Sequence, residues 1–406
     1  MHILLIHQAF AALGEPGGTR HHELARRLAG QGHRVTVLAG RVSYMTGVET
    51  GGAAAESTDE PGVRIIRCWT YRAWHRSFVH RVLSFTSFMA SSFIVGLRVP
   101  RVDLVWGTTP PLFQGLTAWL LARLKRAAFV FEVRDLWPAF AIAVGVLRSP
   151  LLIWLSERLE GFLYRHADRV IINSPGFRDH VVQRGARRVD LVPNGVEAAM
   201  FDPQADGGTF RRAHGWLGKY LALYAGAHGM SNDLGVVLQA AAALQDRGDI
   251  TIVLLGDGKE KPGLMAKAES MGLKNVSFLP PLAKDEMSQA LEAADAGLAT
   301  LLPLEVYKTT YPNKVFDYMA AGRPVVLAID GVIRQVVENA GAGVFVPPGD
   351  PQAMAAAIRQ LADDPAAGRR MGMAGRACVE RNFDRPATAL ALIRSMQAAL
   401  SQRGRG

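Results

Sequence analysis

Residues 311–325 read YPNKVFDYMAAGRPV, and this stretch indicates the fold more clearly than any other. Tyr311-Pro312-Asn313 is typical of an exposed turn that opens a helix. Gly322 is the residue type that often ends a helix. Pro324 begins an apolar run that is typical of a buried parallel strand. A helix followed directly by a strand is the repeating unit of α/β domains, so we expect such a domain here.

The same helix carries groups suited to a nucleotide. Its N-terminus favours anions, and Lys314 adds a positive charge for phosphate. Asp317, one turn later, can accept both hydroxyls of a ribose, as acidic residues do in dinucleotide folds. The alternative is a capped surface helix with a Lys–Asp pair worth roughly 0.2–0.5 kcal/mol.

Strands and helices alternate outward from this stretch in both directions, which is typical of parallel sheets built from βαβ units. A chain of 406 residues is also long for a single core. We therefore predict an α/β protein of two Rossmann-like, doubly wound domains, 1–200 and 201–384, followed by a C-terminal helix at 385–406. The turn-forming Pro193-Asn194-Gly195 is where we expect the halves to join. The expected strands are His2–Ile6, Arg34–Leu38, Val63–Arg67, Leu104–Trp106, Phe129–Glu132, Arg169–Ile172, Leu221–Tyr224, Ile250–Leu255, Val276–Phe278, Ala296–Ala299 and Pro324–Leu327.

Two loops of the first half carry candidate site residues. Gly17-Gly18-Thr19-Arg20 lies between the first strand and the first helix, where glycine lets a ligand approach the backbone; the alternative is a plain tight turn. Arg134 and Asp135 directly follow an apolar strand. Asp135 can orient or deprotonate a hydroxyl, and Arg134 can bind phosphate or carboxylate. The alternative is an Arg–Asp pair that only organises the loop.

Charge and cysteine content restrict the setting. Residues 1–200 hold 24 Lys and Arg against 15 Asp and Glu, and the rest of the chain is nearly balanced, 22 against 21. A one-sided positive field suggests an anionic partner surface, lipid or nucleic acid. The two cysteines form no disulfide or metal-ligand pattern, which favours the cytoplasm. The apolar N-terminus lacks a basic region and a cleavage site, so we interpret it as a core strand.

An uncharged segment, Val82–Leu97, lies between arginines. It allows three interpretations: a buried helix between two strands, an interfacial helix that dips into a bilayer surface, or a membrane span, for which it is short of roughly 20 residues. The basic, Phe-rich surroundings fit a peripheral position on an anionic membrane.

At this point the sequence resembles a known family. FDYMAAGRPV (316–325) is similar to the signature helix of family 4 retaining glycosyltransferases, with Asp317 in the place of the second Glu of the E-x7-E motif. Further matches to the WbuB-like branch, which builds O-antigens and capsules, extend over nearly the whole chain: Gly17–His21, Arg134–Pro138, Pro193–Val196, Gly256–Gly258 and Pro312–Lys314.

The resemblance implies the GT-B fold, in which two domains face across a cleft. The second domain would hold a nucleotide sugar and the first the acceptor, with retention of configuration, no bound metal and no cofactor. Lys314 would neutralise the leaving diphosphate, with Arg134 and Asp135 as the other catalytic residues. The last helix would cross back onto the first domain. The expected substrate-binding residues are Gly17, Gly18, Thr19, Arg20, Gly226, His228, Gly256, Asp257, Gly258, Tyr311, Pro312, Asn313 and Asp317.

Three departures from the family pattern are visible. Thr309 stands where the first Glu of E-x7-E belongs, and Glu305 is displaced by four residues. The loop at 226–232 has no Arg or Lys for the diphosphate, so more of this task would fall on Lys314, Arg134 or His228. No equivalent of the first-domain catalytic His is evident, and the leaving phosphate itself would take the acceptor proton.

The leading hypothesis is transfer of a hexose or N-acetylhexosamine from a nucleotide sugar, expected to be UDP-linked. The acceptor would be a polyprenyl-pyrophosphate lipid or a saccharide in O-antigen or capsule synthesis, on the inner face of the plasma membrane. A nucleotide-sugar 2-epimerase shares the fold, but its acidic and His constellation is not found. A nucleic-acid-binding module is a non-enzyme alternative, which the apolar segment and the lack of an RNA-binding aromatic motif disfavour.

Overall fold

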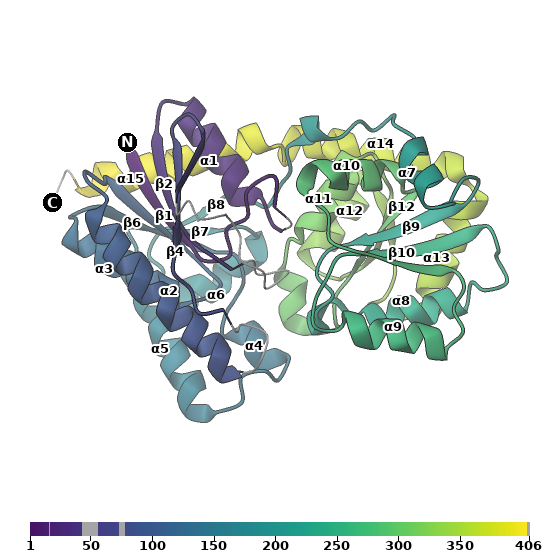
Figure 1. Cartoon of the computed structure of the whole chain (residues 1–406), viewed down its shortest axis with the longest axis horizontal. Helices are drawn as coiled ribbons and strands as arrows, with labels where there is room; N and C mark the ends of the chain where they lie inside the picture. The colour runs from purple at the N-terminus through teal and green to yellow at the C-terminus, as the bar shows by residue number, and fades with distance from the viewer. Residues whose placement is uncertain (16, 43–55, 73–77, 404–406) are drawn as a thin grey trace. The chain divides into compact units, whose positions relative to one another are not determined.

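The computed structural model describes residues 1–15, 17–42, 56–72 and 78–403, and the chain forms two compact units (Figure 1). The first contains Met1–Ala12, Gly17–Pro193 and Pro386–Gly406, and the second contains Leu13–Pro16 and Asn194–Arg385. The division falls inside the expected turn, before the predicted boundary at residue 200. Its physical reason is that Asn194 donates from Nδ2 to the Tyr311 carbonyl at 2.6 Å, which ties the turn to the second unit.

Within the described residues, the first unit holds an eight-stranded sheet in the order β3-β4-β2-β1-β5-β6-β7-β8. All neighbours pair in parallel except β3 and β4, which are antiparallel. The strands are β1 (His2–His7), β2 (Arg34–Gly40), β3 (Glu56–Glu60), β4 (Val63–Cys68), β5 (Leu104–Thr108), β6 (Ala128–Val133), β7 (Arg169–Ile172) and β8 (Val189–Leu191).

Helices cover both faces of this sheet because its central strands are apolar on both sides. On one face, Ile3 and Leu5 of β1 pack with α1 (Arg20–Gly30) and with α15 (Arg385–Arg403), which returns from the end of the chain (Figure 1). On the other face lie α2 (Phe78–Arg98), α3 (Phe113–Leu124) and α5 (Pro150–His166). The remaining short helices are α4 (Ala139–Ala143), η1 (Pro175–Phe177) and α6 (Arg178–Gln183).

The second unit has a six-stranded parallel sheet in the order β11-β10-β9-β12-β13-β14 within the described residues. Its strands are β9 (Tyr220–Ala225), β10 (Ile250–Leu255), β11 (Val276–Leu279), β12 (Ala296–Thr300), β13 (Val325–Ala328) and β14 (Gly343–Phe345). Its helices are η2 (Ala198–Met200), α7 (Gly208–Ala213), η3 (Met230–Asn232), α8 (Leu234–Ala242), α9 (Lys261–Ser270), α10 (Lys284–Ala293), η4 (Glu305–Thr309), α11 (Asn313–Ala320), α12 (Val332–Ala340), α13 (Pro351–Asp363) and α14 (Pro365–Asn382).

Every strand expected from the sequence is present, with ends shifted by up to two residues. Three strands were not predicted. β3 reads ESTDE and has no apolar pattern, and β8 and β14 are only three residues long. Three residues are too few to show the alternation of apolar and polar side chains that predicts a strand, and a strand of polar residues shows no such alternation.

The uncharged segment is part of α2, and its burial fits the first of the three interpretations. Phe88, Ser84 and Ser92 are buried against the first unit, and Leu83, Ile94 and Leu97 are about half exposed. In the part of the chain that the structure describes, no helix is both long and apolar enough to cross a membrane. The interpretation of this segment as a span is therefore wrong.

Candidate active site

The second sheet has a topological switch point between β9 and β12. The chain runs outward from β9 to β10 and β11, then returns to pair β12 with the other side of β9. When the chain turns to opposite sides after two neighbouring strands, a crevice forms at the carboxyl ends of these strands. Open α/β sheets bind ligands in this crevice. The loop that begins at Gly226 follows β9, and the segment after β12 leads to α11.

Lys314, in the first turn of α11, lies at this point. Its Nζ is 3.8 Å from the centre of the Tyr224 ring and donates a hydrogen bond of 3.1 Å to Oδ1 of Asn232. Among the described residues it forms no ion pair with a carboxylate. Burial lowers the pKa of Lys314 to about 7. Taking an ammonium partly out of water without a carboxylate partner is costly, and an anionic ligand would compensate this cost.

Glycines surround this ammonium for a geometric reason. Gly226, Gly256 and Gly258 have φ values of +147°, +138° and +156°. A Cβ on Gly226 would lie 3.3 Å from the Lys314 Nζ. A Cβ on Gly256 would lie 1.9 Å from the Gly226 carbonyl oxygen, and one on Gly258 would lie 2.5 Å from the His228 carbonyl oxygen. The loops after β9 and β10 therefore pack backbone against backbone, and residues without side chains are needed at these three positions for the loops to approach each other and Lys314 this closely.

Asp257 and His228 connect the same two loops. The His228 amide donates to the Asp257 carbonyl at 2.8 Å, and Asp257 Oδ1 accepts from the Gly258 amide at 2.8 Å. Burial, with the nearby Lys261 charge, lowers the pKa of His228 to about 4 while Asp257 opposes the shift. His228 is therefore neutral near pH 7. That His228 helps to bind a diphosphate stays a prediction, and its imidazole keeps two ring nitrogens without a partner among the described residues.

The other predicted site residues of the stretch 311–317 differ in how far they are buried. The Tyr311 ring packs edge-on against Phe316 and Phe383 at 5.7 and 6.0 Å, so it belongs partly to the core. Pro312 is extended, with φ −67° and ψ 127°, and precedes the first residue of α11, the exposed Asn313. Asp317 is half-buried, one turn after Lys314.

The missing first Glu of the family motif is not replaced by Glu305. Its side chain is 86% exposed and pairs with Lys308 at 2.6 Å. The Thr309 hydroxyl donates to the Val306 carbonyl at 2.6 Å, which closes the short helix η4. Glu305 and Thr309 thus each contact another residue of the same short helix.

Three contributors to this site were missed from the sequence. Asn232 and Tyr224 hold Lys314 from the β9 side, and Lys261 donates from Nζ to the carbonyls of Gly256 and Leu279 at 2.7 and 2.8 Å. Their only sequence signal is position, since each lies on or just after a strand of the second half. Contacts made across a sheet edge are not visible in local patterns.

The first sheet has its own switch point between β1 and β5. The loop after β1 leads to Gly17, which has φ +148°, and to Gly18, around which a Cβ would meet nothing within 4 Å. Thr19 is buried, and its hydroxyl donates to Glu23 at 2.6 Å. This open, glycine-containing entry into α1 is the part of the predicted loop that a ligand can approach.

Arg20 is instead part of a buried charge cluster centred on Glu132. It pairs with Glu132 Oε1 and donates to the Val192 carbonyl at 2.9 Å. Glu132 Oε2 lies 2.7 Å from His21 Nε2 and accepts from Trp106 Nε1 at 3.1 Å. Burial lowers the pKa of His21 to about 4 against the pull of Glu132. Burial alone would raise the pKa of Glu132, but the charges of Arg20 and its neighbours lower it. This ion pair accounts for Arg20 without a ligand.

Arg134 and Asp135 follow β6 at the carboxyl edge of the first sheet. Arg134 donates from Nε to the Thr109 carbonyl at 2.6 Å and from its guanidinium to the Pro110 carbonyl at 3.3 Å. It thereby ties the loops after β5 and β6 together. Burial raises the pKa of the Asp135 carboxyl, and Arg134 opposes the rise. A carboxyl group shifted upward in this way is better suited to accept a proton than an exposed one.

Comparison with known proteins agrees with these two units. Residues 17–195 match a family model described as a glycosyl transferase 4-like domain, and residues 219–364 match the model of glycosyl transferases group 1. WcaI of Escherichia coli (strain K12), named as a colanic acid biosynthesis glycosyl transferase, is 27% identical over 83% of this chain and 86% of its own length.

Solved structures show the same fold. Sucrose-phosphate synthase from Thermosynechococcus elongatus aligns with a TM-score of 0.79 at 20% identity, over 99% of each chain. HepE from Anabaena, in complex with UDP-glucose, aligns with a TM-score of 0.72 at 18% identity, over 98% of this chain and 99% of that chain. Because the two family models together cover most of the chain and the fold agrees along its whole length, the protein is a glycosyltransferase of family 4 with the GT-B fold.

Proposed function

We propose that this glycosyltransferase moves a hexose or N-acetylhexosamine from a UDP-linked donor to a lipid-linked or saccharide acceptor during assembly of a surface polysaccharide. The observation that carries the proposal is Lys314, a half-buried lysine that pairs with no carboxylate among the described residues and lies at the switch point of the second sheet. A diphosphate supplies the negative charge that this position lacks.

In the proposed reaction, the acceptor hydroxyl attacks the anomeric carbon as its bond to the diphosphate oxygen breaks. Negative charge then develops on the leaving diphosphate, where Lys314 and the N-terminus of α11 stabilise it. The glycine loops at Gly226 and Gly256–Gly258 would admit the phosphates close to the backbone, and Asp317 would hold the ribose. The hydroxyl attacks from the same face of the sugar that the diphosphate leaves, so configuration is retained, and its proton passes to the leaving phosphate. Lys314 takes the place that a metal ion has in other transferases.

Asp135 and Arg134 are proposed as the groups of the first unit that orient the acceptor. The Asp135 carboxyl, whose pKa is raised by burial, can accept a hydrogen bond from the acceptor hydroxyl and orient it. The side chain of Arg134 joins two loops of that edge, so its replacement would also change their positions.

Two relatives support the choice of donor and pathway. HepE binds UDP-glucose, and the name of WcaI places it in colanic acid biosynthesis. In line with this pathway, we propose that the protein belongs to the WbuB-like branch, whose members build O-antigens and capsules.

Release of nucleotide only in the presence of an acceptor is the expected result for the purified protein. UDP-sugars are supplied with and without a polyprenyl-pyrophosphate-linked saccharide, and free UDP and the anomeric configuration of the product are measured. EDTA is expected to leave the rate unchanged. Release of UDP without acceptor, together with conversion of the sugar, would show a 2-epimerase instead, and activity lost in EDTA would contradict the metal-independent reaction.

We further propose that the protein binds the inner face of the plasma membrane through α5 rather than through α2. One face of α5 carries three apolar residues and an arginine at helical spacing: Leu151, Trp154, Leu155 and Arg158. The three apolar residues are 47–65% exposed. The Arg158 guanidinium lies 5.3 Å from the centre of the Trp154 ring. Exposed apolar residues beside an arginine are typical of helices at an anionic lipid surface.

Vesicle sedimentation is the measurement for this surface. Leu151→Ser combined with Trp154→Ser is expected to lower binding to anionic vesicles by at least about fivefold, because two inserted side chains lose their apolar burial. The control pair is Leu217→Ser with Met265→Ser, two exposed residues of the second unit. Equal binding by wild type and the α5 variant at low salt would contradict the proposal.

A further inference from the structure

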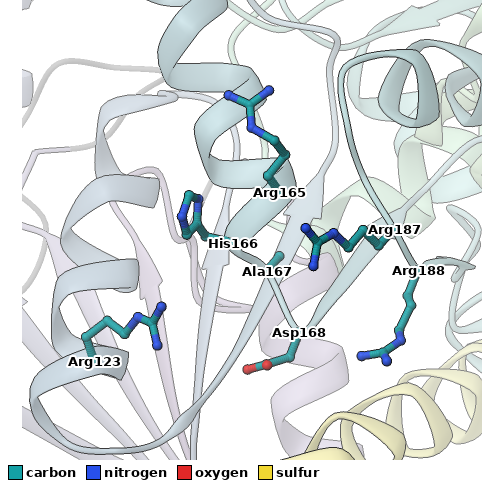
Figure 2. Close-up of a pocket in the computed structure, with 7 residues that line it drawn as sticks. All are labelled: Arg123, Arg165, His166, Ala167, Asp168, Arg187 and Arg188. Carbon is teal, nitrogen blue, oxygen red and sulfur yellow. The ribbon is translucent and has the colours of Figure 1, made fainter.

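A second concave site lies on the first unit, at the edge where strands begin. It is a pocket of about 420 Å³ lined by Arg123, Arg165, His166, Ala167, Asp168, Arg187 and Arg188 (Figure 2). Arg123 comes from the end of α3, Arg165 and His166 from the end of α5, and Arg187 and Arg188 from the residues just before β8. Figure 2 shows Asp168 in the view between Arg123 and Arg188. We call this set the arginine pocket.

The charges of the arginine pocket do not cancel. Four guanidinium groups and one carboxylate, Asp168, line it, and one oxygen of that carboxylate already accepts from the Phe129 amide at 2.7 Å. Arg188 donates to the Gln402 side chain at 2.6 Å, which leaves its charge uncompensated. Among the described residues, Arg123, Arg165 and Arg187 form no ion pair. The pocket is therefore a concentrated positive site, with four guanidinium groups against one carboxylate.

Helix stability explains only part of this cluster. Arg123 and Arg165 lie in the last turns of their helices, where a cation interacts favourably with the helix dipole. Arg187 and Arg188 lie on no helix, so the dipole does not account for them. Like charges that share one concave surface repel each other. An anion bound in the pocket would offset this repulsion.

The arginine pocket is separate from the groups proposed for catalysis in the same unit. Arg134 and Asp135 follow the end of β6, whereas the pocket residues precede β6, β7 and β8. The six residues of β6 span roughly 20 Å between these two edges of the sheet. A ligand in the pocket thus occupies a second site.

We propose that the arginine pocket binds a phosphate monoester or diphosphate group. Guanidinium groups bind phosphate through paired N–H donors, and several of them can share the oxygens of one such group. Two sources carry this chemistry: a soluble phosphorylated metabolite or the headgroup of an anionic lipid. Because the arginines are exposed, the binding is expected to weaken strongly with salt.

Titration with inorganic pyrophosphate tests the site, using full-length Lys314→Ala so that the proposed donor site does not contribute. Calorimetry is expected to show binding that falls at least about tenfold when Arg123→Ser and Arg187→Ser are added, since two charged contacts are lost. The matched control adds Arg369→Ser and Arg370→Ser, which remove the same charge from an exposed helix of the second unit. Transfer activity is expected to persist when Arg123→Ser and Arg187→Ser are placed in the wild-type chain, so failure of this site and failure of the proposed function are distinguishable.

Vesicles identify the source of the phosphate. In a Leu151→Ser, Trp154→Ser background, vesicles with phosphatidic acid are compared with phosphatidylcholine vesicles. If the ligand is a lipid headgroup, Arg123→Ser with Arg187→Ser lowers phosphatidic acid binding below that of the Arg369, Arg370 control. If the ligand is soluble, only pyrophosphate binding falls. The proposal is overturned if the pocket variant and the control variant bind both probes equally.

Discussion

Replacing Lys314 with alanine is expected to lower kcat/KM for the nucleotide sugar by about ten- to hundredfold. The reason is the loss of a charged contact to the leaving diphosphate, worth about 1.5–3 kcal/mol. The second unit is expected to remain at least as stable, because burial has lowered the pKa of Lys314 to about 7, and removing a partly buried cation relieves its desolvation. Steady-state kinetics and thermal unfolding of the same preparation measure both effects.

Lys274→Ala, at an exposed lysine of the second unit, is the control and is expected to keep wild-type activity. An active Lys314→Ala enzyme would contradict the proposed site. An inactive enzyme with greatly reduced stability would instead assign Lys314 a structural role.

The titration of Lys314 gives this prediction a pH signature. The unfolded side chain has a pKa near 10.5 and the folded one about 7, so between these values the unfolded chain binds more protons. Stability of the second unit therefore rises with pH in this window. Donor binding needs the protonated form and is expected to weaken from pH 7 to 9. In Lys314→Arg the guanidinium stays charged, and this pH dependence of donor binding should disappear.

Glu132→Ala is expected to lower the free energy of unfolding of the first unit by about 3–5 kcal/mol. It would leave the buried Arg20 without its carboxylate, and loss of one partner from a buried pair has this magnitude. Denaturant unfolding followed by tryptophan fluorescence is suited to the test, because Trp106 donates to Glu132. Activity of the fraction that remains folded is expected to persist.

The comparison variant is Glu380→Ala. Glu380 pairs with Arg376 at 2.7 Å but is 53% exposed, so its loss is expected to cost no more than about 1 kcal/mol. Equal effects of the two variants would show that the Glu132 cluster contributes no more than a surface pair. Acid sensitivity is a second sign of the cluster. The pKa of His21 is about 4 when folded and near 6.5 when unfolded, so stability is expected to fall as pH decreases from 6.5 to 4.

The sequence by itself determined the two α/β units, because their strands are short apolar runs separated by helical patterns. It also determined the candidate donor helix, since the Pro312, Gly322 and Pro324 signals that start and stop this helix are local. For the same reason the helix of residues 313–320 could be bounded from the residues alone. The edge strand β3 could not, because its sequence is polar and its pairing depends on β4.

Only the tertiary structure decided what surrounds each charge. Lys314 and Arg20 both lie in the first turn of a helix, and the sequence assigned both to a ligand. The fold leaves Lys314 without a carboxylate among the described residues but joins Arg20 to Glu132, which lies 112 residues away in sequence. The physical reason is that an ion pair depends on the distance between two side chains in space, and that distance is set by strand order, which no local pattern encodes.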